Sequence, residues 1–258
     1  MELPCLSPGE VIVRRFFVPP ESLADGCAVI TGDLFRHMAK VLRLKPGARV
    51  LLADGRGTEF AGIIDSVGKE NLVVTLQESC VAAPVVAVPR ITLFQGLPKG
   101  DKLEFILQKT TELGVAEVIP FAAARSVSRI RKGEAAEKVV RWQRIVQEAA
   151  RQSGRSSVPQ VALAGSLAEV VNTSGHEVKF LLWEGEKVNR LKDTLAGLAK
   201  PDTIALIVGP EGGLTAEEAA TATADGFIPV SLGPRIVRTE TAGLVMMAIL
   251  QFYWGDIG

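Results

Sequence analysis

The sequence has little of the residue types that form common metal and nucleophile sites. Its 258 residues include three cysteines, Cys5, Cys27 and Cys80, and two histidines, His37 and His176. The cysteines are far apart and form no Cys-x-x-Cys pair, which favours neither a disulfide framework nor a zinc site. The histidines fit neither an HExxH pattern nor a Ser-His-Asp triad. We therefore expect no metal, with His37 on an exposed helix and His176 in a loop.

Long hydrophobic runs are also missing. The longest apolar run near the carboxyl end, residues 242–250, is well short of the roughly 20 residues that a membrane-spanning helix needs. The N-terminus, MELPCLSPGEV, has proline, glycine and acids where a secretory signal has basic residues and an apolar core. We therefore expect a cytoplasmic protein with no membrane partner.

The charge of the chain is balanced overall but unevenly distributed. The formal net charge is zero, and 47% of the residues are hydrophobic, enough for one large domain or two modest ones. Residues 1–80 carry 9 basic and 10 acidic groups, residues 90–158 carry 13 and 7, and residues 159–258 carry 7 and 12. A basic block inside a neutral chain indicates a local anionic partner such as a nucleic acid backbone.

The first third of the chain reads as a small β-rich module. Turn residues at 54–57 and 68–71 are typical of hairpins and favour a small barrel. Residues 79–89 have small side chains, two prolines and no charge, as expected of a linker. We therefore predict a domain at residues 1–80 and a second at residues 90–258. The predicted elements of the first are strands at 11–18, 49–53, 58–67 and 72–77, and a helix at 32–41 capped near Asp33.

From residue 90 onward, short apolar strands alternate with helices. This alternation predicts an α/β fold in which a parallel sheet has helices on both faces. Asp101 with Glu104, and Thr215 with Glu218, have the spacing of helix-capping pairs, and Gly114 is placed to end the first helix. The predicted strands are 91–97, 115–121, 180–183, 204–208 and 227–232, and the predicted helices include 134–152, 189–199 and 239–253. Helix 134–152 is expected to bury Ala136, Val139, Val140, Gln143, Val146 and Ala150.

Two of these strands end in similar turns. Residues 204–208 are followed by Gly209-Pro210-Glu211-Gly212-Gly213, and residues 227–230 lead to Gly233-Pro234-Arg235. Carboxyl ends of parallel strands share one edge of a sheet, where ligands bind, so these turns are expected to form two walls of one small-molecule site. Their glycines let main-chain groups approach a flat ring closely. The alternative is that they are only tight strand-to-helix turns.

The segment 235–242, RIVRTETA, places two arginines, two hydroxyls and a carboxylate just before a hydrophobic helix. A helix N-terminus favours anionic groups, and Thr239 or Thr241 can cap it. The alternative is a simple capping arrangement in which Arg238 pairs with Glu240. The sequence has neither GxxxxGK[ST] nor GxGxxG between a strand and a helix, so a nucleoside-like cofactor would bind in another way.

Five motifs in order resemble the RsmE-type family, bacterial enzymes that methylate N3 of a uridine in small-subunit (16S) ribosomal RNA. The family lies within the SPOUT superfamily of knotted methyltransferases. The resemblance runs from about residue 13 to residue 254, with about a dozen extra N-terminal residues and with Ile236-Val237 where other aliphatics can occur. The motifs are RRFF (14–17), KGDKLEFILQKTTELGV (99–115), EAARQSGRSSVPQ (148–160), GPEGGLT (209–215) and LGPRIVRTETA (232–242).

The resemblance implies a C-terminal domain with a deep trefoil knot, an exception to the rule that chains avoid threading, and an N-terminal PUA-like β-barrel that helps hold RNA. It implies a homodimer. The last helix, whose apolar residues include Leu244, Val245, Met247, Ala248 and Leu250, is a candidate for part of the interface, and the alternative is an ordinary core helix. It also implies that S-adenosylmethionine lies bent in the knot. The implied cofactor-binding residues are Leu182, Trp183, Glu184, Gly209, Pro210, Glu211, Gly212, Leu232, Gly233, Ile236, Arg238, Thr239, Thr241 and Ala242.

The implied reaction requires removal of a proton that N3 of uridine holds between two carbonyl groups. Our hypothesis is that Arg238 stabilises the uracil oxyanion and that Glu240 is the base or an orienting group. The substrate would be small-subunit ribosomal RNA or the assembled small subunit, with the target base flipped or splayed into the site. Two alternatives stay open: a SPOUT enzyme acting on a ribose 2′-hydroxyl, and a non-catalytic RNA-binding assembly factor.

The RNA-binding surface is inferred from the basic residues. Because a run of basic residues is also typical of a solvated helix face, phosphate contact remains a hypothesis for all of them. The candidates are Arg14, Arg15, Arg125, Arg129, Arg131, Lys132, Arg141, Arg144, Arg151 and Arg155.

Overall fold

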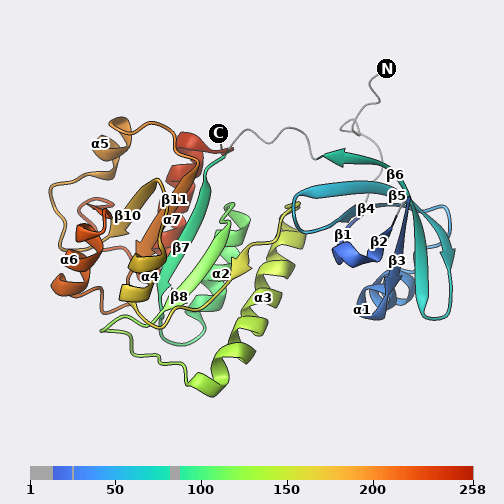
Figure 1. The fold of residues 1–258 in the computed structure, drawn as a ribbon, viewed down its shortest axis with the longest axis horizontal. Helices are drawn as coiled ribbons and strands as arrows, with labels where there is room; N and C mark the ends of the chain where they lie inside the picture. Colours follow the sequence, from blue (N-terminus) through green and yellow to red (C-terminus); the bar gives the residue numbers. More distant parts are fainter. Residues whose placement is uncertain (1–13, 25, 82–87, 258) are drawn as a thin grey trace. The chain divides into compact units, whose positions relative to one another are not determined.

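Two units make up the chain (Figure 1). The computed structural model describes residues 14–24, 26–81 and 88–257. One unit comprises Met1–Val85 with Ala150–Val158, and the other comprises Val86–Ala149 with Pro159–Gly258. The segment Ala150–Val158 packs with the first unit in part through a hydrogen bond in which Val158 N donates to Gly55 O at 3.1 Å.

The N-terminal unit is built on a six-stranded sheet with the order β1-β4-β5-β6-β3-β2. Among the pairs of described strands in this sheet, only β1–β4 is parallel. Register shifts at Phe60/Gly62 and Ile64/Ser66 interrupt the β5–β6 ladder, and such bulges bend a sheet around its core. The pairings of the described strands run from β1 to β2 without a closing pair. The strands are β1 Arg14–Phe17, β2 Leu23–Ala24, β3 Cys27–Thr31, β4 Arg49–Ala53, β5 Thr58–Val67 and β6 Asn71–Val81.

Most predicted elements of this unit are present, with two corrections. Strands 49–53 and 58–67 are confirmed, β1 lies within the predicted strand 11–18, and residues 11–13 lie outside the described residues. The predicted linker overlaps β6, because residues 79–81 still pair with β5; residues 82–87 lie outside the described part.

The second correction concerns the short helix. The chain forms α1, Gly32–Phe35, and continues as a π-helix, Arg36–Val41, which carries the exposed His37 as predicted. The N-cap is Thr31, so the predicted cap near Asp33 is wrong. The Asp33 carboxylate instead pairs with Arg36, one turn further along the exposed surface. A 3₁₀ turn, Pro20–Ser22, precedes β2.

The C-terminal unit contains the predicted parallel sheet, with the order β12-β10-β11-β7-β8-β9. The central strand β11 is buried along most of its length, as expected of a strand covered on both faces. β9 is short and was not predicted. The strands are β7 Arg90–Gly96, β8 Glu117–Phe121, β9 Gln160–Val161, β10 Val178–Leu182, β11 Thr203–Val208 and β12 Ile228–Val230.

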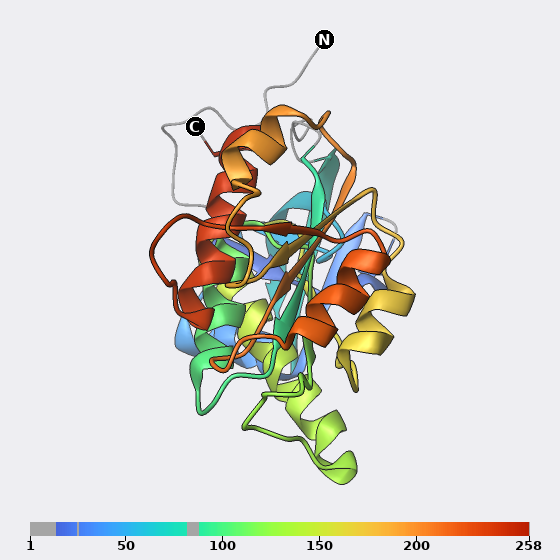
Figure 2. The ribbon, with the colours of Figure 1, turned by 90° about the vertical axis from the view of Figure 1, so that its left-hand side faces the viewer.

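Helices cover both faces of this sheet, as the alternation predicted (Figure 2). α2, Lys102–Glu112, packs beside α7, Thr239–Trp254, on one face. α4, Leu167–Thr173, which was not predicted, packs beside α6, Ala216–Ala224, on the other. The remaining helices are a 3₁₀ turn Lys132–Glu134, α3 Ala135–Gln152 and α5 Leu191–Ala196. No helix of the described residues is long and apolar enough to cross a membrane.

One predicted capping pair is confirmed and the other is wrong. Thr215 Oγ1 accepts from Glu218 N at 3.1 Å, and Glu218 Oε2 accepts from Thr215 N at 2.9 Å, which completes a capping box. Asp101 occupies the N-cap position of α2, but its side chain makes no capping hydrogen bond. Its backbone carbonyl accepts from Glu104 N instead.

The buried face of α3 differs in part from the predicted one. Val146 and Ala150 are buried as expected, whereas Ala136 and Val140 are exposed. Trp142 and Ala149 are buried in addition to the predicted positions. Gln143 is half-buried because its amide bridges Pro159 O and Val161 N. Helical spacing alone could not show where along the helix the covering elements begin.

His176 lies in the loop between α4 and β10, as predicted, and is half-buried. Its Nε2 is 2.9 Å from Thr92 Oγ1, and its Nδ1 is 3.1 Å from Ser174 Oγ. Burial lowers the pKa of the His176 imidazole below its usual value, and the charge of Lys179 lowers it further.

This lowered pKa predicts a pH-dependent stability. Below about pH 6.5, the unfolded chain binds a proton that the folded chain resists, so stability should fall as the pH drops from there toward the folded pKa. Thermal unfolding between pH 8 and pH 5 should show this loss in the wild type and a smaller loss in His176→Gln. The exposed His37→Gln serves as the control and should follow the wild type. Equal pH dependence in all three proteins would contradict this assignment.

Candidate functional site

A cavity of about 1000 Å³ lies at the carboxyl edge of the parallel sheet. Its walls come mainly from three segments, which follow β10, β11 and β12, and Lys102 of α2 also lines it. These three strands are neighbours in the sheet and run parallel, so their carboxyl ends open onto the same edge. Both glycine-proline turns line this one cavity, as predicted, and its use as a small-molecule site stays a prediction.

Most residues predicted to bind a cofactor line this cavity. Gly212 and Thr241 do not: Gly212 O accepts from Arg125 Nη1 at 3.1 Å, and Thr241 is exposed on α7. Both residues predicted to be catalytic also line the cavity. The lining members of the two predicted sets are Leu182, Trp183, Glu184, Gly209, Pro210, Glu211, Leu232, Gly233, Ile236, Arg238, Thr239, Glu240 and Ala242.

Neither threonine caps α7, which corrects a prediction. The N-cap position is Arg238, without a side-chain capping bond. Thr239 is buried, and its Oγ1 donates to Gly209 O at 2.5 Å, so this hydroxyl joins the start of α7 to the turn after β11. The Thr239 hydroxyl therefore donates to a carbonyl of another element, whereas the sequence pattern indicated that it accepts from a local backbone N–H.

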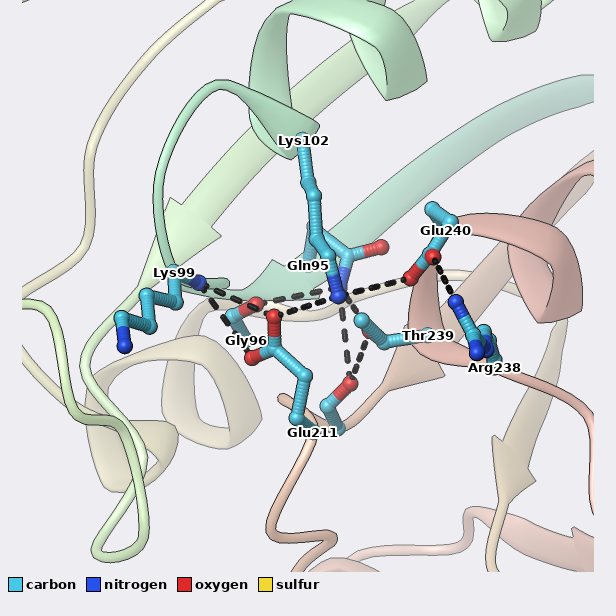
Figure 3. A network of polar contacts seen from close by, with 9 residues as sticks. Gln95, Gly96, Lys99, Lys102, Glu211, Arg238, Thr239 and Glu240 are labelled. Atoms are coloured by element: carbon cyan, nitrogen blue, oxygen red, sulfur yellow. Dashed lines mark hydrogen bonds and ion pairs between the residues drawn. The ribbon is translucent and has the colours of Figure 1, made fainter.

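Gln95, near the end of β7, continues this connection (Figure 3). Its side chain is buried, and its Nε2 donates to Thr239 Oγ1 and to Gly96 O, each at 3.0 Å, with Gly209 O at 3.5 Å. Its Oε1 has no hydrogen-bond partner among the described residues. Sequence analysis missed Gln95, although a single amide within the apolar strand ITLFQG was an available signal.

A group of charged residues lies beside this buried chain of hydrogen bonds (Figure 3). Lys102 Nζ is 3.0 Å from Glu211 Oε1 and 3.3 Å from Glu240 Oε2. Lys99 N also donates to Glu211 Oε1, at 3.1 Å. Arg238 Nη1 is 4.0 Å from Glu240 Oε1, so the expected Arg238–Glu240 pair is present but long. Sequence analysis did not single out Lys102.

These contacts keep Lys102 and Glu211 charged. The hydrogen bond to Glu211 raises the pKa of Lys102 above its usual value, against the effect of burial, and Glu240 contributes in the same direction. Burial alone would raise the pKa of Glu211, but hydrogen bonds from Lys102 and from backbone N–H groups outweigh it and lower that pKa. The pair is therefore intact at neutral pH and is lost when acid protonates Glu211 or when base deprotonates Lys102.

Close backbone approach explains one glycine at this edge. A Cβ on Gly96 would lie 2.6 Å from Pro210 Cδ and 2.7 Å from Pro210 N. The end of β7 therefore packs directly under the turn after β11. Any larger residue at position 96 would displace that cavity wall.

The predicted RNA-binding residues are spread over both units. Arg14 is exposed on β1, while Arg15 is half-buried and pairs with Glu59 at 2.8 Å. Arg151 and Arg155 belong to the segment that groups with the first unit. In the second unit, Arg125 contacts Gly212 as described above, and the side chain of Lys132 is outside the described part. The members of the predicted set that are exposed in the second unit are Arg125, Arg129, Arg131, Arg141 and Arg144. Arg141 lies 2.5 Å from Glu104, and Arg131 lies 3.8 Å from Glu134.

Within the described residues, no group of three or more histidine, cysteine, aspartate or glutamate side chains is arranged to hold a metal ion.

Comparison with known proteins identifies the family. Residues 86–251 match a family described as RNA methyltransferase domain, and residues 30–77 match one described as RNA methyltransferase PUA domain. The chain is 34% identical to ribosomal RNA small subunit methyltransferase E of Bacillus subtilis over 231 residues, covering 86% of this chain and 89% of the relative. The chain belongs to this methyltransferase family. The same-named protein of Mycobacterium bovis is 31% identical, with 92% and 90% covered.

Solved structures of the family have the same fold. A ribosomal RNA small subunit methyltransferase E from Neisseria gonorrhoeae, bound to S-adenosyl methionine, is 33% identical with a TM-score of 0.83, covering 95% of this chain and 100% of that one. A putative methyltransferase from Legionella pneumophila, in complex with the cofactor SAM, is 31% identical with a TM-score of 0.83, covering 96% and 100%. The family resemblance inferred from the five motifs is confirmed, as is the PUA-like character of the N-terminal domain.

The buried position of Gln95 predicts a cost for removing its amide. Gln95→Leu keeps the side-chain volume but removes the amide donor. The buried Gly96 O then loses this donor, and Thr239 Oγ1 loses its hydrogen bond to β7. We expect the free energy of unfolding to fall by about 1–3 kcal/mol, measured by urea denaturation. The exposed Gln160→Leu is the control and should change little. A Gln95→Leu protein as stable as the wild type would contradict the structural role of this amide.

Proposed function

We propose that this chain transfers a methyl group from S-adenosylmethionine to N3 of a uridine in small-subunit ribosomal RNA. The observation that carries the proposal is the single cavity in which the turns after β10, β11 and β12 meet, in a chain of the methyltransferase E family. The Neisseria gonorrhoeae relative bound to S-adenosyl methionine supports the choice of cofactor, and the relatives' names support the ribosomal RNA substrate.

The cavity fits an adenosyl cofactor by its chemistry. Gly209 and Gly233 leave main-chain groups bare at two of the turns, where they can bond the edge of a flat ring. Carboxylates on the lining offer partners for the cationic groups of the cofactor. The bound cofactor supplies an electrophilic methyl group. Apolar contact with the ring would come from Leu182, Val208, Leu214, Val230 and Ala242, and the lining carboxylates are Glu184, Glu186, Glu211 and Glu240.

Arg238 and Glu240 are placed to assist loss of the N3 proton. The side chain of Arg238 is 83% exposed, so its guanidinium can reach a substrate that enters the cavity from solvent. We assign it to stabilising the oxyanion that forms on the uracil ring. The Glu240 carboxylate is only 17% exposed and lies beside Lys102, and we assign it the role of base or orienting group.

The finer architecture is also a proposal. We propose that the C-terminal domain, residues 90–258, carries the trefoil knot of the SPOUT superfamily, and that residues 1–80 form the PUA-like barrel. The strand order, in which β10 lies between β12 and β11, brings the chain segments after all three strands together, as such a knot requires. We place the enzyme in the cytoplasm, without a metal.

Met247 and Leu250 of α7 are buried in the core, as in the alternative of a core helix, so they are not available for an interface. We propose a homodimer that uses the outer face of α2 and α7 instead. Phe105 of α2 is 45% exposed, and Phe252 and Tyr253 of α7 are 71% and 47% exposed. The two helices pack side by side, so these aromatic side chains lie on adjoining elements. Large exposed apolar side chains on neighbouring helices favour a protein contact.

The RNA contact is proposed to use the exposed arginines of the 122–144 region. Arg129 and Arg144 are exposed, whereas Arg15 is committed to Glu59 and therefore supports the fold of the first unit as well. Phosphate contacts would position the RNA without reading its sequence.

The decisive experiment measures methyl transfer to small-subunit RNA, supplied either naked or as assembled small subunits, with mass analysis of the nucleoside product. N3-methyluridine is the expected product. A 2′-O-methyl nucleoside would instead support the alternative SPOUT activity. RNA binding without transfer, together with no S-adenosylmethionine binding by calorimetry, would support the non-catalytic assembly factor.

Substitution of Arg238 tests its assigned role. Arg238→Ala should lower kcat on the order of 100-fold, because a donor to the developing oxyanion is lost. The dissociation constant for S-adenosylmethionine should change far less, since Arg238 is assigned to the RNA base. Arg90→Ala, at an exposed arginine of the same unit outside the cavity lining, is the control and should leave kcat near the wild type. Equal losses of turnover and of cofactor affinity in Arg238→Ala would count against the assignment.

A further inference from the structure

Lys102 is the only described residue whose side chain contacts both Glu211, in the turn after β11, and Glu240, in the first turn of α7. Lys102 is itself the first residue of α2. Its ammonium group therefore connects three elements around the cavity, which are α2, the turn after β11 and α7 (Figure 3). Its side chain is 36% exposed and lines the cavity with both carboxylates. A flexible lysine held in this way has lost most of the freedom that an exposed lysine keeps.

We propose that Lys102 is a positioning residue for methyl transfer, which holds the Glu240 carboxylate in its working orientation and fixes α7 relative to the turn that carries Glu211. The inference rests on the proposed function and adds a residue to it. The raised pKa of Lys102 and the lowered pKa of Glu211 agree with a charged contact that persists at neutral pH.

Lys102 is more important for the position of Glu240 than for that of Glu211, because the backbone of Lys99 also holds Glu211. Lys99 N donates to both carboxylate oxygens of Glu211, at 3.1 and 3.3 Å, and would hold it without Lys102. Glu240 has Lys102 at 3.3 Å and Arg238 at 4.0 Å as its charged partners in the described structure. Its Oε2 is buried and has no hydrogen-bond partner among the residues that the structure describes, so the attraction of the Lys102 ammonium compensates its burial.

The two cations near Glu240, Lys102 and Arg238, therefore have different roles. Lys102 is more enclosed, closer to Glu240 and already engaged with two carboxylates. Arg238 is 83% exposed and distant enough to leave Glu240 when RNA arrives. When Arg238 turns to the uracil oxygen, Lys102 keeps the Glu240 carboxylate from moving with it or taking a second rotamer.

The test compares Lys102→Met with Lys109→Met. Lys109 lies on the same helix, is also 36% exposed and also loses an ion pair, with Glu112 at 2.8 Å, but does not line the cavity. We expect kcat to fall about 10- to 100-fold in Lys102→Met, as misplacement of a reacting group does, and to stay near the wild type in Lys109→Met. Affinity for S-adenosylmethionine, by calorimetry, should change less than about 3-fold in both, since Lys99 still holds Glu211.

Two further variants separate positioning from loss of structure. Lys102→Arg keeps the charge and should recover most of the turnover lost in Lys102→Met. Lys102→Met added to Glu240→Gln should cost little beyond Glu240→Gln alone, because the two side chains act as one unit. Fully additive losses, or wild-type turnover in Lys102→Met, would overturn the inference.

The test of Lys102 can fail or succeed independently of the test of the proposed function. Absence of methyl transfer in the wild type would overturn the proposed function itself. In that case the thermal unfolding midpoints of the same variants decide the inference: Lys102→Met should lower the midpoint in the wild-type background and less so in the Glu240→Gln background. Equal effects in the two backgrounds would overturn the contact between Lys102 and Glu240.

Discussion

The hydrogen bonds from Gln95 through Thr239 to Gly209 hold the cavity together. They join the end of β7, the first residue of α7 and the turn after β11, three places that are far apart in the sequence. A buried amide and a buried hydroxyl have strong reason to keep these partners, because the low-dielectric interior offers them no water. Gly96 reinforces the same junction by allowing Pro210 to approach the strand. Glu211 and Glu240 follow closely on two of the joined places, so this junction helps to set their positions.

The cavity beside this junction combines an apolar lining with charged side chains of both signs. The carboxylates suit a cationic cofactor, whereas the exposed Arg238 suits an anionic substrate that arrives from solvent. Lys102 offsets the repulsion between the carboxylates of Glu211 and Glu240, because both lie within ion-pair distance of its ammonium group. The rigid part of the site thus lies on strand ends and helix starts, and the part that we propose meets RNA lies on an exposed loop. This arrangement matches a cofactor that must be fixed and an RNA base that must enter and leave.

Those features that depend on local pattern were predictable from sequence. The parallel sheet follows from short apolar strands between helices, the shared edge follows from the two glycine-proline turns, and the Thr215–Glu218 capping box follows from its spacing. Features set by tertiary partners were not predictable in this way. Thr239 is a residue type that often caps helices, but its hydroxyl donates to Gly209 O instead. Gln95 and Lys102 gain their roles only from residues more than a hundred positions away. The buried face of α3 was shifted for the same reason: periodicity defines a stripe, but the covering elements define which part of it is buried.

Amide hydrogen exchange with and without S-adenosylmethionine tests the central claim most directly. If the three turns at the carboxyl edge hold the cofactor, its addition should slow exchange in residues 182–184, 209–213 and 232–242 and leave the β-strands of the N-terminal unit unchanged. Protection of some other region, or cofactor binding seen by calorimetry without protection of these three segments, would contradict the account.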